Sequence, residues 1–247
     1  MKSFHFSVDD VLPALIEVTD KNIPLVDNQF FNQLRIIYEK YGVKTGLNLF
    51  YSHNIDGKVR YLSEVRDIKE ELKDGWLYFA PHSLDFDTPP YSQNINDQIK
   101  TLEMIMNEIK RIAGGYKASS VRFHYYSECY EIAENILNHG INEIFITDKL
   151  IGSYKLPKSY IEEIIEKGSI RFNGLKVTRT NFRVENFANE RFSKDKLTKS
   201  FSDILNKHSR IVIYSHEYEH SRKDVNKMLM VTMDILVNKL GLISEIP

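Results

Sequence analysis

The feature that most limits the fold of this chain is a repeated alternation between short apolar runs and longer segments of helical period. The apolar runs, which we interpret as strands, cover residues 3–8, 43–51, 76–81, 120–125, 143–147 and 210–215. Helical periodicity appears near residues 27–41, 61–73, 95–112, 127–138 and 221–240. Strands that alternate with helices are typical of parallel sheets whose faces are covered by helices.

One further segment adds to the predicted sheet. Within residues 168–180, the dipeptide Asn173-Gly174 lies between two β-rich runs, which is a strong signal for a two-residue hairpin. We count this hairpin as a seventh sheet element. With 247 residues, 42% of them hydrophobic, and no Pro/Gly-rich linker, we expect one domain over 1–247, with an elaboration at about 149–208. The pattern predicts an α/β fold, either a parallel barrel or a doubly wound sheet.

Composition argues against several classes of protein. Lys and Arg number 33 against 34 Asp and Glu, without a long basic run, so we expect no nucleic-acid binding. No stretch approaches the roughly 18 apolar residues that a membrane-spanning helix needs. The single cysteine, Cys129, cannot form an internal disulfide, and the chain opens on MKSFHFSVDD without the pattern of an export signal. We therefore expect a cytoplasmic location.

Ionisable side chains follow nearly every predicted strand at its carboxyl end. In chain order they are Asp9, Asp10, His53, His82, His124, Asp148 and His216. The carboxyl ends of parallel strands meet on one face of a barrel or sheet, so these side chains are expected to converge. Adjacent carboxylates repel each other and are costly to desolvate, which favours a cation beside Asp9 and Asp10. His and Asp together form a ligand set suited to zinc or another divalent transition metal.

Three of these segments are similar to motifs of the polysaccharide deacetylase superfamily. Ser7-Val8-Asp9-Asp10 resembles its Thr-Phe-Asp-Asp motif, and Ile213-Tyr214-Ser215-His216 resembles its Leu-x-His motif. Arg122-Phe123-His124-Tyr125-Tyr126 loosely resembles Arg-x-x-Pro-Tyr, without the proline. The resemblance spans nearly the whole chain. It implies a single-domain, distorted seven-stranded (β/α) barrel.

The resemblance also implies an activity: metal-dependent hydrolysis that removes an N-acetyl or related acyl group from a sugar or glycan precursor. By carry-over, Asp9 is the general base, Asp10 binds the metal and His216 is the general acid. Arg122 would orient the base. We expect Tyr125 and His53 to contact the carbohydrate substrate.

The second motif of the family departs from the pattern in this chain. The family has His-Ser/Thr-x-x-His with both histidines on the metal, whereas His82-Ser83-Leu84-Asp85-Phe86 places Phe86 at the second position. His124 could supply the missing nitrogen, Asp85 or Asp87 could supply an oxygen, or the site could be lost. We favour His124 because its strand is expected to neighbour that of His82. The predicted ligands of a divalent metal, expected to be zinc, are then Asp10, His82 and His124.

Other functions stay open at this point. A barrel that has lost its metal would serve as a binding or interaction domain. Asp85-x-Asp87 could hold the metal of a nucleotide-sugar-dependent glycosyltransferase, and Asp85-Phe86-Asp87-Thr88 superficially matches the phosphatase pattern Asp-x-Asp-x-Thr. The transferase interpretation gives Asp9, Asp10 and His216 no role. The phosphatase pattern requires its aspartate to close a strand directly, but Pro81-His82-Ser83 intervenes.

Overall fold

The computed structural model describes residues 2–147 and 155–247. Its strands are β1 Ser3–Asp9, β2 Thr45–Phe50, β3 Ser52–Ile55, β4 Lys58–Tyr61, β5 Leu77–Ser83, β6 Ser120–Val121, β7 Glu143–Ile146, β8 Ser169–Phe172, β9 Leu175–Arg179, β10 Phe182–Arg183, β11 Arg210–His216 and β12 Ile243–Ser244. Its α-helices are α1 Pro13–Asp20, α2 Gln29–Tyr41, α3 Ile95–Ala113, α4 Ala133–Asn138, α5 Lys158–Lys167, α6 Val184–Asn189, α7 Lys194–Leu205 and α8 Lys223–Asp234. None of the described helices is both long enough and apolar enough to cross a membrane.

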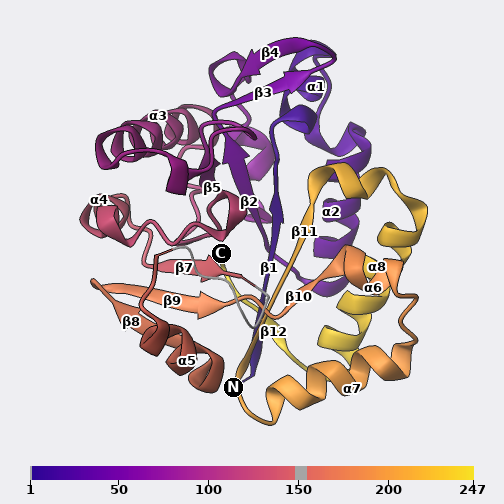
Figure 1. Ribbon diagram of the computed structural model, residues 1–247. Coiled ribbons are helices and arrows are strands. Elements are labelled where there is room, and N and C mark those ends of the chain that lie inside the picture. Colours follow the sequence, from indigo (N-terminus) through magenta and orange to yellow (C-terminus); the bar gives the residue numbers. More distant parts are fainter. Residues whose placement is uncertain (1, 148–154) are drawn as a thin grey trace.

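Two sheets of parallel strands make up the centre of the molecule (Figure 1). The first has the order β10-β11-β1-β2-β5, and the second has the order β6-β7-β9 with β8 antiparallel at its edge. Between β5 and the segment before β6, a parallel bridge pairs Phe79 with Lys117, and the Ala118 amide donates to the Phe79 carbonyl at 2.8 Å. The sheets therefore continue into each other on this side.

On the other side, the sheets meet through the link from β9 to β10. The Thr180 amide donates to the Ile146 carbonyl of β7, at 3.1 Å, and the Asn181 amide donates to the Val212 carbonyl of β11, at 2.9 Å. Seven parallel strands, β11-β1-β2-β5-β6-β7-β9, thus follow one another around the core. The predicted α/β fold is confirmed.

The predicted hairpin at 168–180 is also confirmed, as β8 and β9. Asn173 and Gly174 have φ angles of 49° and 82°, which suits the type I′ turn that joins two-residue hairpins. The strands predicted at 3–8, 43–51, 76–81, 143–147 and 210–215 are present as β1, β2, β5, β7 and β11. Both β9 and β10 lie within the segment expected to be an elaboration, and they contribute to the wall of parallel strands.

Helix ends follow local sequence signals. Asn28 caps α2, because its side-chain oxygen accepts hydrogen bonds from the amides of Phe30 and Phe31. Gly42 ends the same helix with a φ of 68°, a conformation that costs glycine little. Asn94 caps α3 in the same way, and α3 buries one apolar face against the sheet.

The prediction of a helix at 61–73 is wrong. Only short 3₁₀ turns, Leu62–Glu64 and Lys69–Leu72, form there. The apolar spacing is real, since Leu62, Val65, Ile68 and Leu72 are buried. The Arg111 guanidinium donates to the carbonyls of Leu62, Ser63 and Val65, and the Ile68 amide donates to Ile112 of α3. These tertiary bonds take the groups that a helix would have paired.

The strand predicted at 120–125 ends early, at Val121. His124–Tyr126 form a 3₁₀ turn in which Tyr125 and Tyr126 have φ angles of 52° and 57°. This left-handed backbone takes the chain out of the sheet. The helix predicted at 127–138 is correspondingly shortened to α4, which begins at Ala133.

Candidate metal centre

The side chains predicted at the strand ends do converge. A cavity of about 220 Å³ opens at the carboxyl ends of β1, β5 and β11. Its lining residues are Asp9, Asp10, His82, Phe86, Arg122, Phe123, His124, Tyr125, Tyr126, Arg183, Tyr214, His216 and Tyr218. Of the eight residues predicted for the site, seven line this cavity. His53 does not, and Asp148 lies outside the described residues.

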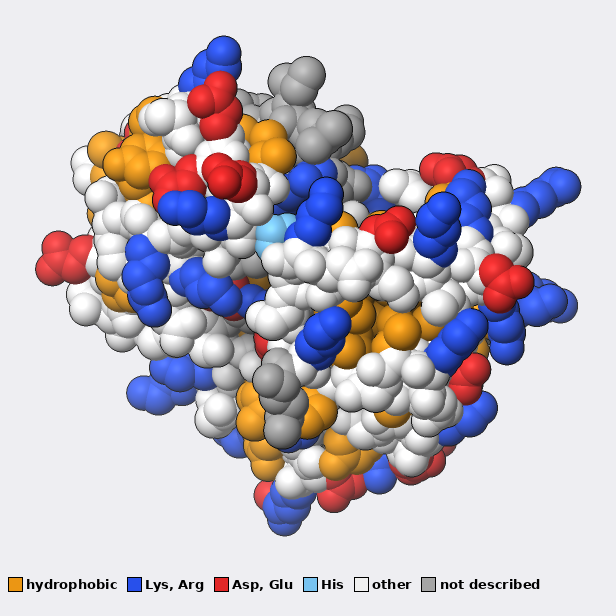
Figure 2. All heavy atoms as spheres, turned by 90° about the horizontal axis from the view of Figure 1, so that it is seen from below, with side chains coloured by type: hydrophobic (Ala, Val, Ile, Leu, Met, Phe, Trp, Pro, Cys, Tyr) orange, Lys and Arg blue, Asp and Glu red, His pale blue; other side chains and the backbone are white. Residues whose placement is uncertain are grey.

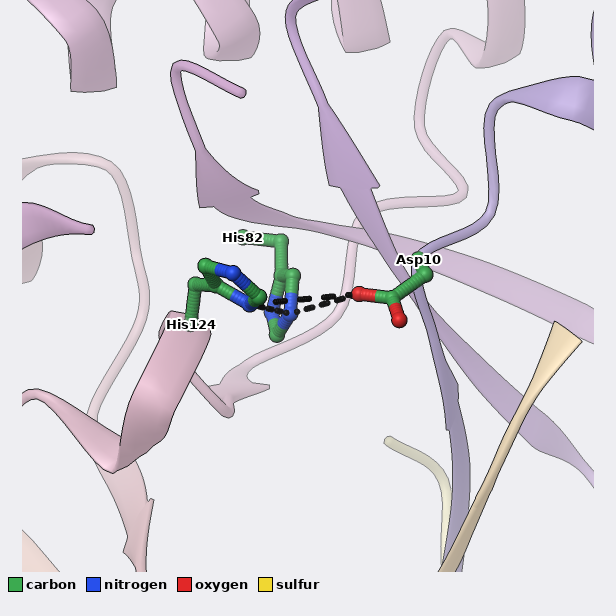
Figure 3. A group of neighbouring side chains, drawn as sticks. All are labelled: Asp10, His82 and His124. Atoms are coloured by element: carbon green, nitrogen blue, oxygen red, sulfur yellow. Dashed lines mark hydrogen bonds and ion pairs between the residues drawn. The ribbon is translucent and has the colours of Figure 1, made fainter. Parts of the chain in front are cut away.

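Asp10, His82 and His124 point their polar atoms at one another (Figure 3). Asp10 Oδ1 lies 3.2 Å from His82 Nε2 and 3.9 Å from His124 Nδ1, and the two ring nitrogens are 3.2 Å apart. All three residues are buried. One ion could therefore contact one atom of each residue.

Each histidine has one ring nitrogen that faces Asp10 and one outer nitrogen that bonds to a backbone carbonyl, and the outer bond sets the orientation of the ring. His82 Nδ1 donates to the Arg122 carbonyl at 2.6 Å, and His124 Nε2 donates to the Phe86 carbonyl at 3.0 Å. A carbonyl only accepts, so each contact places the proton on the outer nitrogen and leaves a lone pair on the inner one. This is the arrangement that commonly orients metal-binding histidines.

A divalent metal fits these residues. Two lone pairs facing each other are repulsive unless a cation lies between them, and Asp10 Oδ1 is a buried carboxylate oxygen without a hydrogen-bond partner in the described structure. One carboxylate and two imidazoles are a donor set that zinc accepts while leaving positions for water or substrate. The residues that are present thus suit a divalent metal.

The protonation states agree with this geometry. Burial lowers the pKa of His124 to about 4, so its imidazole is neutral near pH 7. For Asp10, burial acts to raise the pKa, but the neighbouring imidazoles of His82, His216 and His124 hold it below the usual value. An ionised Asp10 and a neutral His124 are the forms that bind metal.

Asp9, in contrast, is held by protein donors through its Oδ1. Asn48 Nδ2 donates to its Oδ1 at 2.7 Å, and Arg122 Nη1 donates to the same atom at 3.2 Å. Asp9 and Asp10 are adjacent, and neighbouring residues of a strand point to opposite faces. Asp10 follows the end of β1 with a φ of 68°, and this left-handed turn lets both carboxylates reach the cavity.

Arg122 is buried in the middle of the barrel, where its exposed fraction is 1%. Besides Asp9, its guanidinium donates to Ser7 Oγ at 2.9 Å and to Thr180 Oγ1 at 3.3 Å, and it stacks on the Tyr214 ring at 3.9 Å. Contacts on all these sides leave the guanidinium a single orientation. Arg122 can therefore fix the direction of the Asp9 carboxylate.

His216 ends β11 across the cavity and forms a short ion pair between its Nδ1 and Glu185 Oε1. Burial alone would lower its pKa, but Glu185, Asp9 and Asp10 raise it above the usual value, which favours the protonated form. The sequence analysis missed Glu185. It is the second residue of α6, directly after the two-residue strand β10, and no local pattern distinguishes it from a surface acid.

The loop in which this chain departs from the family motif contributes Phe86 to the cavity, and neither of its two aspartates. The Phe86 ring lies 5.2 Å from the His124 ring and lines the cavity, while Asp85 and Asp87 do not line it.

His53, on β3, stacks on the far side of Phe50, 5.7 Å from its ring, and Phe50 in turn packs against His82 and His124. Tyr125 lines the cavity and is 43% exposed, so a bound molecule could reach it.

No protein-family model matches the sequence, and no curated protein matches it either. Solved structures do. A family 4 carbohydrate esterase from Streptomyces lividans, in complex with acetate, is 11% identical with a TM-score of 0.54, and the match covers 98% of this chain and 91% of the esterase. The chitin deacetylase of Colletotrichum lindemuthianum is 12% identical with a TM-score of 0.54, over 99% of this chain and 85% of the other.

A 4-alpha-glucanotransferase from Thermococcus litoralis is also similar, at 14% identity and a TM-score of 0.59. The match covers 98% of this chain but only 37% of the transferase. Identities this low show the fold alone. The structure and its neighbours together establish that this chain adopts the distorted (β/α)-barrel fold found in family 4 carbohydrate esterases.

Proposed function

We propose that this chain is a metal-dependent hydrolase that removes an N-acetyl or related acyl group from a carbohydrate. The observation that supports it most is the pairing of two different carboxylates in one cavity. Asp10 faces two imidazole lone pairs, whereas Asp9, beside it, is held by Asn48 and Arg122. One carboxylate is thus placed to bind a cation and the other to accept a proton.

The proposed metal is zinc, held by Asp10, His82 and His124. When bound, a divalent metal supplies Lewis acidity and lowers the pKa of a coordinated water to near 7. Asp9 would take the proton from the attacking water, because Arg122 and Asn48 hold its carboxylate toward the cavity. His216, kept protonated by Glu185, would donate a proton to the leaving amine. The acid and the base must be in opposite protonation states, so a bell-shaped pH profile is expected.

The substrate is proposed to be a soluble or lipid-linked sugar precursor, in keeping with the cytoplasmic location that the sequence predicts. Tyr125 and Tyr218, exposed by 43% and 56%, line the same cavity and offer aromatic faces to a sugar ring. The contribution of His53 to substrate binding stays a prediction, since Phe50 separates it from the metal ligands.

The decisive experiment measures acetate release from N-acetylglucosamine and its short oligomers. Chelator-treated protein should be inactive, and zinc should restore activity in a one-to-one ratio. Asp9→Asn should retain zinc and lose about 10²–10⁴-fold in turnover, as expected for removal of a general base. A protein that purifies without stoichiometric metal and releases no acetate after zinc loading would instead be a metal-free binding domain.

A further inference from the structure

A second cavity, of about 440 Å³, lies at the opposite end of the barrel from the candidate metal centre. It is bordered by Ser3 and Arg210, the first residues of β1 and β11, and by Lys176 near the start of β9. The metal centre lies at the carboxyl ends of β1, β5 and β11. This second cavity is therefore a separate site.

The cavity exists because the barrel is not evenly closed. β9 pairs with β7 and β8, while β11 pairs with β1 and β10, so β9 and β11 share no ladder. Asn181 bridges this gap to β11, with its amide on the Val212 carbonyl and its side-chain oxygen accepting from the Val212 amide at 2.7 Å.

The side chains that border the cavity are strongly basic. The charged or imidazole-bearing residues that line the cavity are Lys167, Lys176, Arg179, Lys207, His208, Arg210 and Glu245. Figure 2 views the molecule from this end, where Lys and Arg side chains are interspersed with Asp and Glu over the face and a histidine is visible. Among the described lining residues, Glu245 is the one carboxylate, although the chain as a whole carries a net charge of -1.

Part of this basic charge is balanced by the protein and part is left over. Buried Glu143 pairs with Lys176 at 3.0 Å and with Arg210, and Glu245 pairs with Arg210 as well. Lys167 pairs with Glu163 on the outer side of α5. Lys207, at the mouth of the cavity, is exposed. The lining thus holds five Lys and Arg side chains, against Glu245 in the lining and Glu143 beside it.

The Arg and Lys side chains of the cavity also affect a histidine inside the barrel. His5 of β1 is fully buried, and its pKa is lowered well below the usual value, first by burial and then by Arg210, Arg122 and Lys176. An anion in the cavity would offset two of these three charges. Arg210 and Lys176 therefore border both the cavity and the interior of the barrel.

We propose that this cavity binds a small anion that carries two or more phosphate groups. Arg and Lys side chains recognise phosphate through charge-assisted hydrogen bonds, and Arg offers a planar fork for two oxygens. A volume of about 440 Å³ is within the range of small-molecule sites, roughly 300–1,000 Å³, and exceeds what a single water or chloride needs. Half-buried Lys176, Arg179 and Arg210 are preorganised at the wall, and exposed Lys167 and Lys207 border the mouth.

Titration of inorganic pyrophosphate into chelator-treated protein tests this proposal. Chelation removes any contribution of the metal centre, so the result does not depend on the proposed hydrolase activity. Calorimetry at constant ionic strength should show saturable binding at a one-to-one ratio. The double variant Lys167→Gln/Lys207→Gln should bind about tenfold more weakly, because two charge-assisted contacts are lost.

Lys199→Gln, on the exposed surface of α7 away from the cavity, is the matched control and should bind as the unmodified chain does. Lys167→Gln breaks only the exposed ion pair with Glu163, so thermal unfolding without anion should change little in either variant. Equal weakening in the control, or no saturation, would overturn the proposal. Binding only to vesicles containing phosphatidic acid, with none of pyrophosphate, would overturn it too, and would identify a membrane contact in place of a small-molecule site.

Discussion

Asp9 and Asp10 are neighbours in the chain, are both buried, and yet have opposite surroundings. The Asp9 carboxylate accepts hydrogen bonds from Asn48 and Arg122, whereas Asp10 Oδ1 has no hydrogen-bond partner in the described structure and faces two imidazoles. A buried charge is stable when its partners come from the protein, and it calls for an external partner when they do not. The difference teaches that one position is built for orientation and the other for binding a cation.

The largest expected effect comes from removing the cation that pairs with Asp9. Arg122→Met should destabilise the protein by about 3–5 kcal/mol, because Asp9 is then left buried without its cation. Urea unfolding at pH 7 measures it. Adding Asp9→Asn should recover part of the loss. Arg60→Met, which breaks an exposed pair with Asp20, serves as the control and should cost far less. Equal effects of the two Arg variants would contradict the special role of Arg122.

Substitution of Asp10 should change the affinity for metal rather than the stability of the fold. Asp10→Asn should weaken zinc binding by about 100-fold, since the charged ligand is lost. Asp9→Asn should leave zinc affinity within about threefold, because Asp9 is occupied by Asn48 and Arg122. Competition with a chromophoric chelator measures both. If the two variants lose zinc equally, the division of labour between the carboxylates is wrong.

The replacement of the expected second histidine can be tested by exchange. His124→Ala should weaken zinc binding, and Phe86→His in that background should restore about tenfold of the affinity, because the Phe86 ring lies 5.2 Å from that of His124. Phe86→Leu in the same background controls for loss of the ring and should restore nothing. Failure of the histidine to rescue would mean that the 84–88 loop directs this side chain away from Asp10 and His82.

The smallest effect concerns the pH profile. Glu185 raises the pKa of His216, so Glu185→Gln should let His216 lose its proton at lower pH. A general acid acts only when protonated, so the alkaline limb of the activity profile should move to lower pH. Activity should fall several-fold more at pH 8.5 than at pH 6.5, with zinc content unchanged. A uniform fall across the pH range would indicate that Glu185 has only a structural role.

Most of the fold was predictable because strands leave a strong local signal. The apolar runs that became β1, β5, β7 and β11, and the Asn173-Gly174 turn, follow from period and turn chemistry. The helix expected at 61–73 failed because tertiary contacts from Arg111 and Ile112 took its backbone partners. Glu185 was missed because its partner, His216, is 31 residues away along the chain. A contact between residues so far apart in the chain produces no local sequence pattern.

The sequence by itself determined which residue types end each strand, and hence that Asp and His side chains would collect at one face. Only the tertiary structure decided which role each could take. Two backbone carbonyls, from Arg122 and Phe86, set which nitrogen of His82 and of His124 faces Asp10. The reason is physical: a strand end fixes where a side chain begins, but its protonation and direction depend on hydrogen bonds to groups that are distant in sequence.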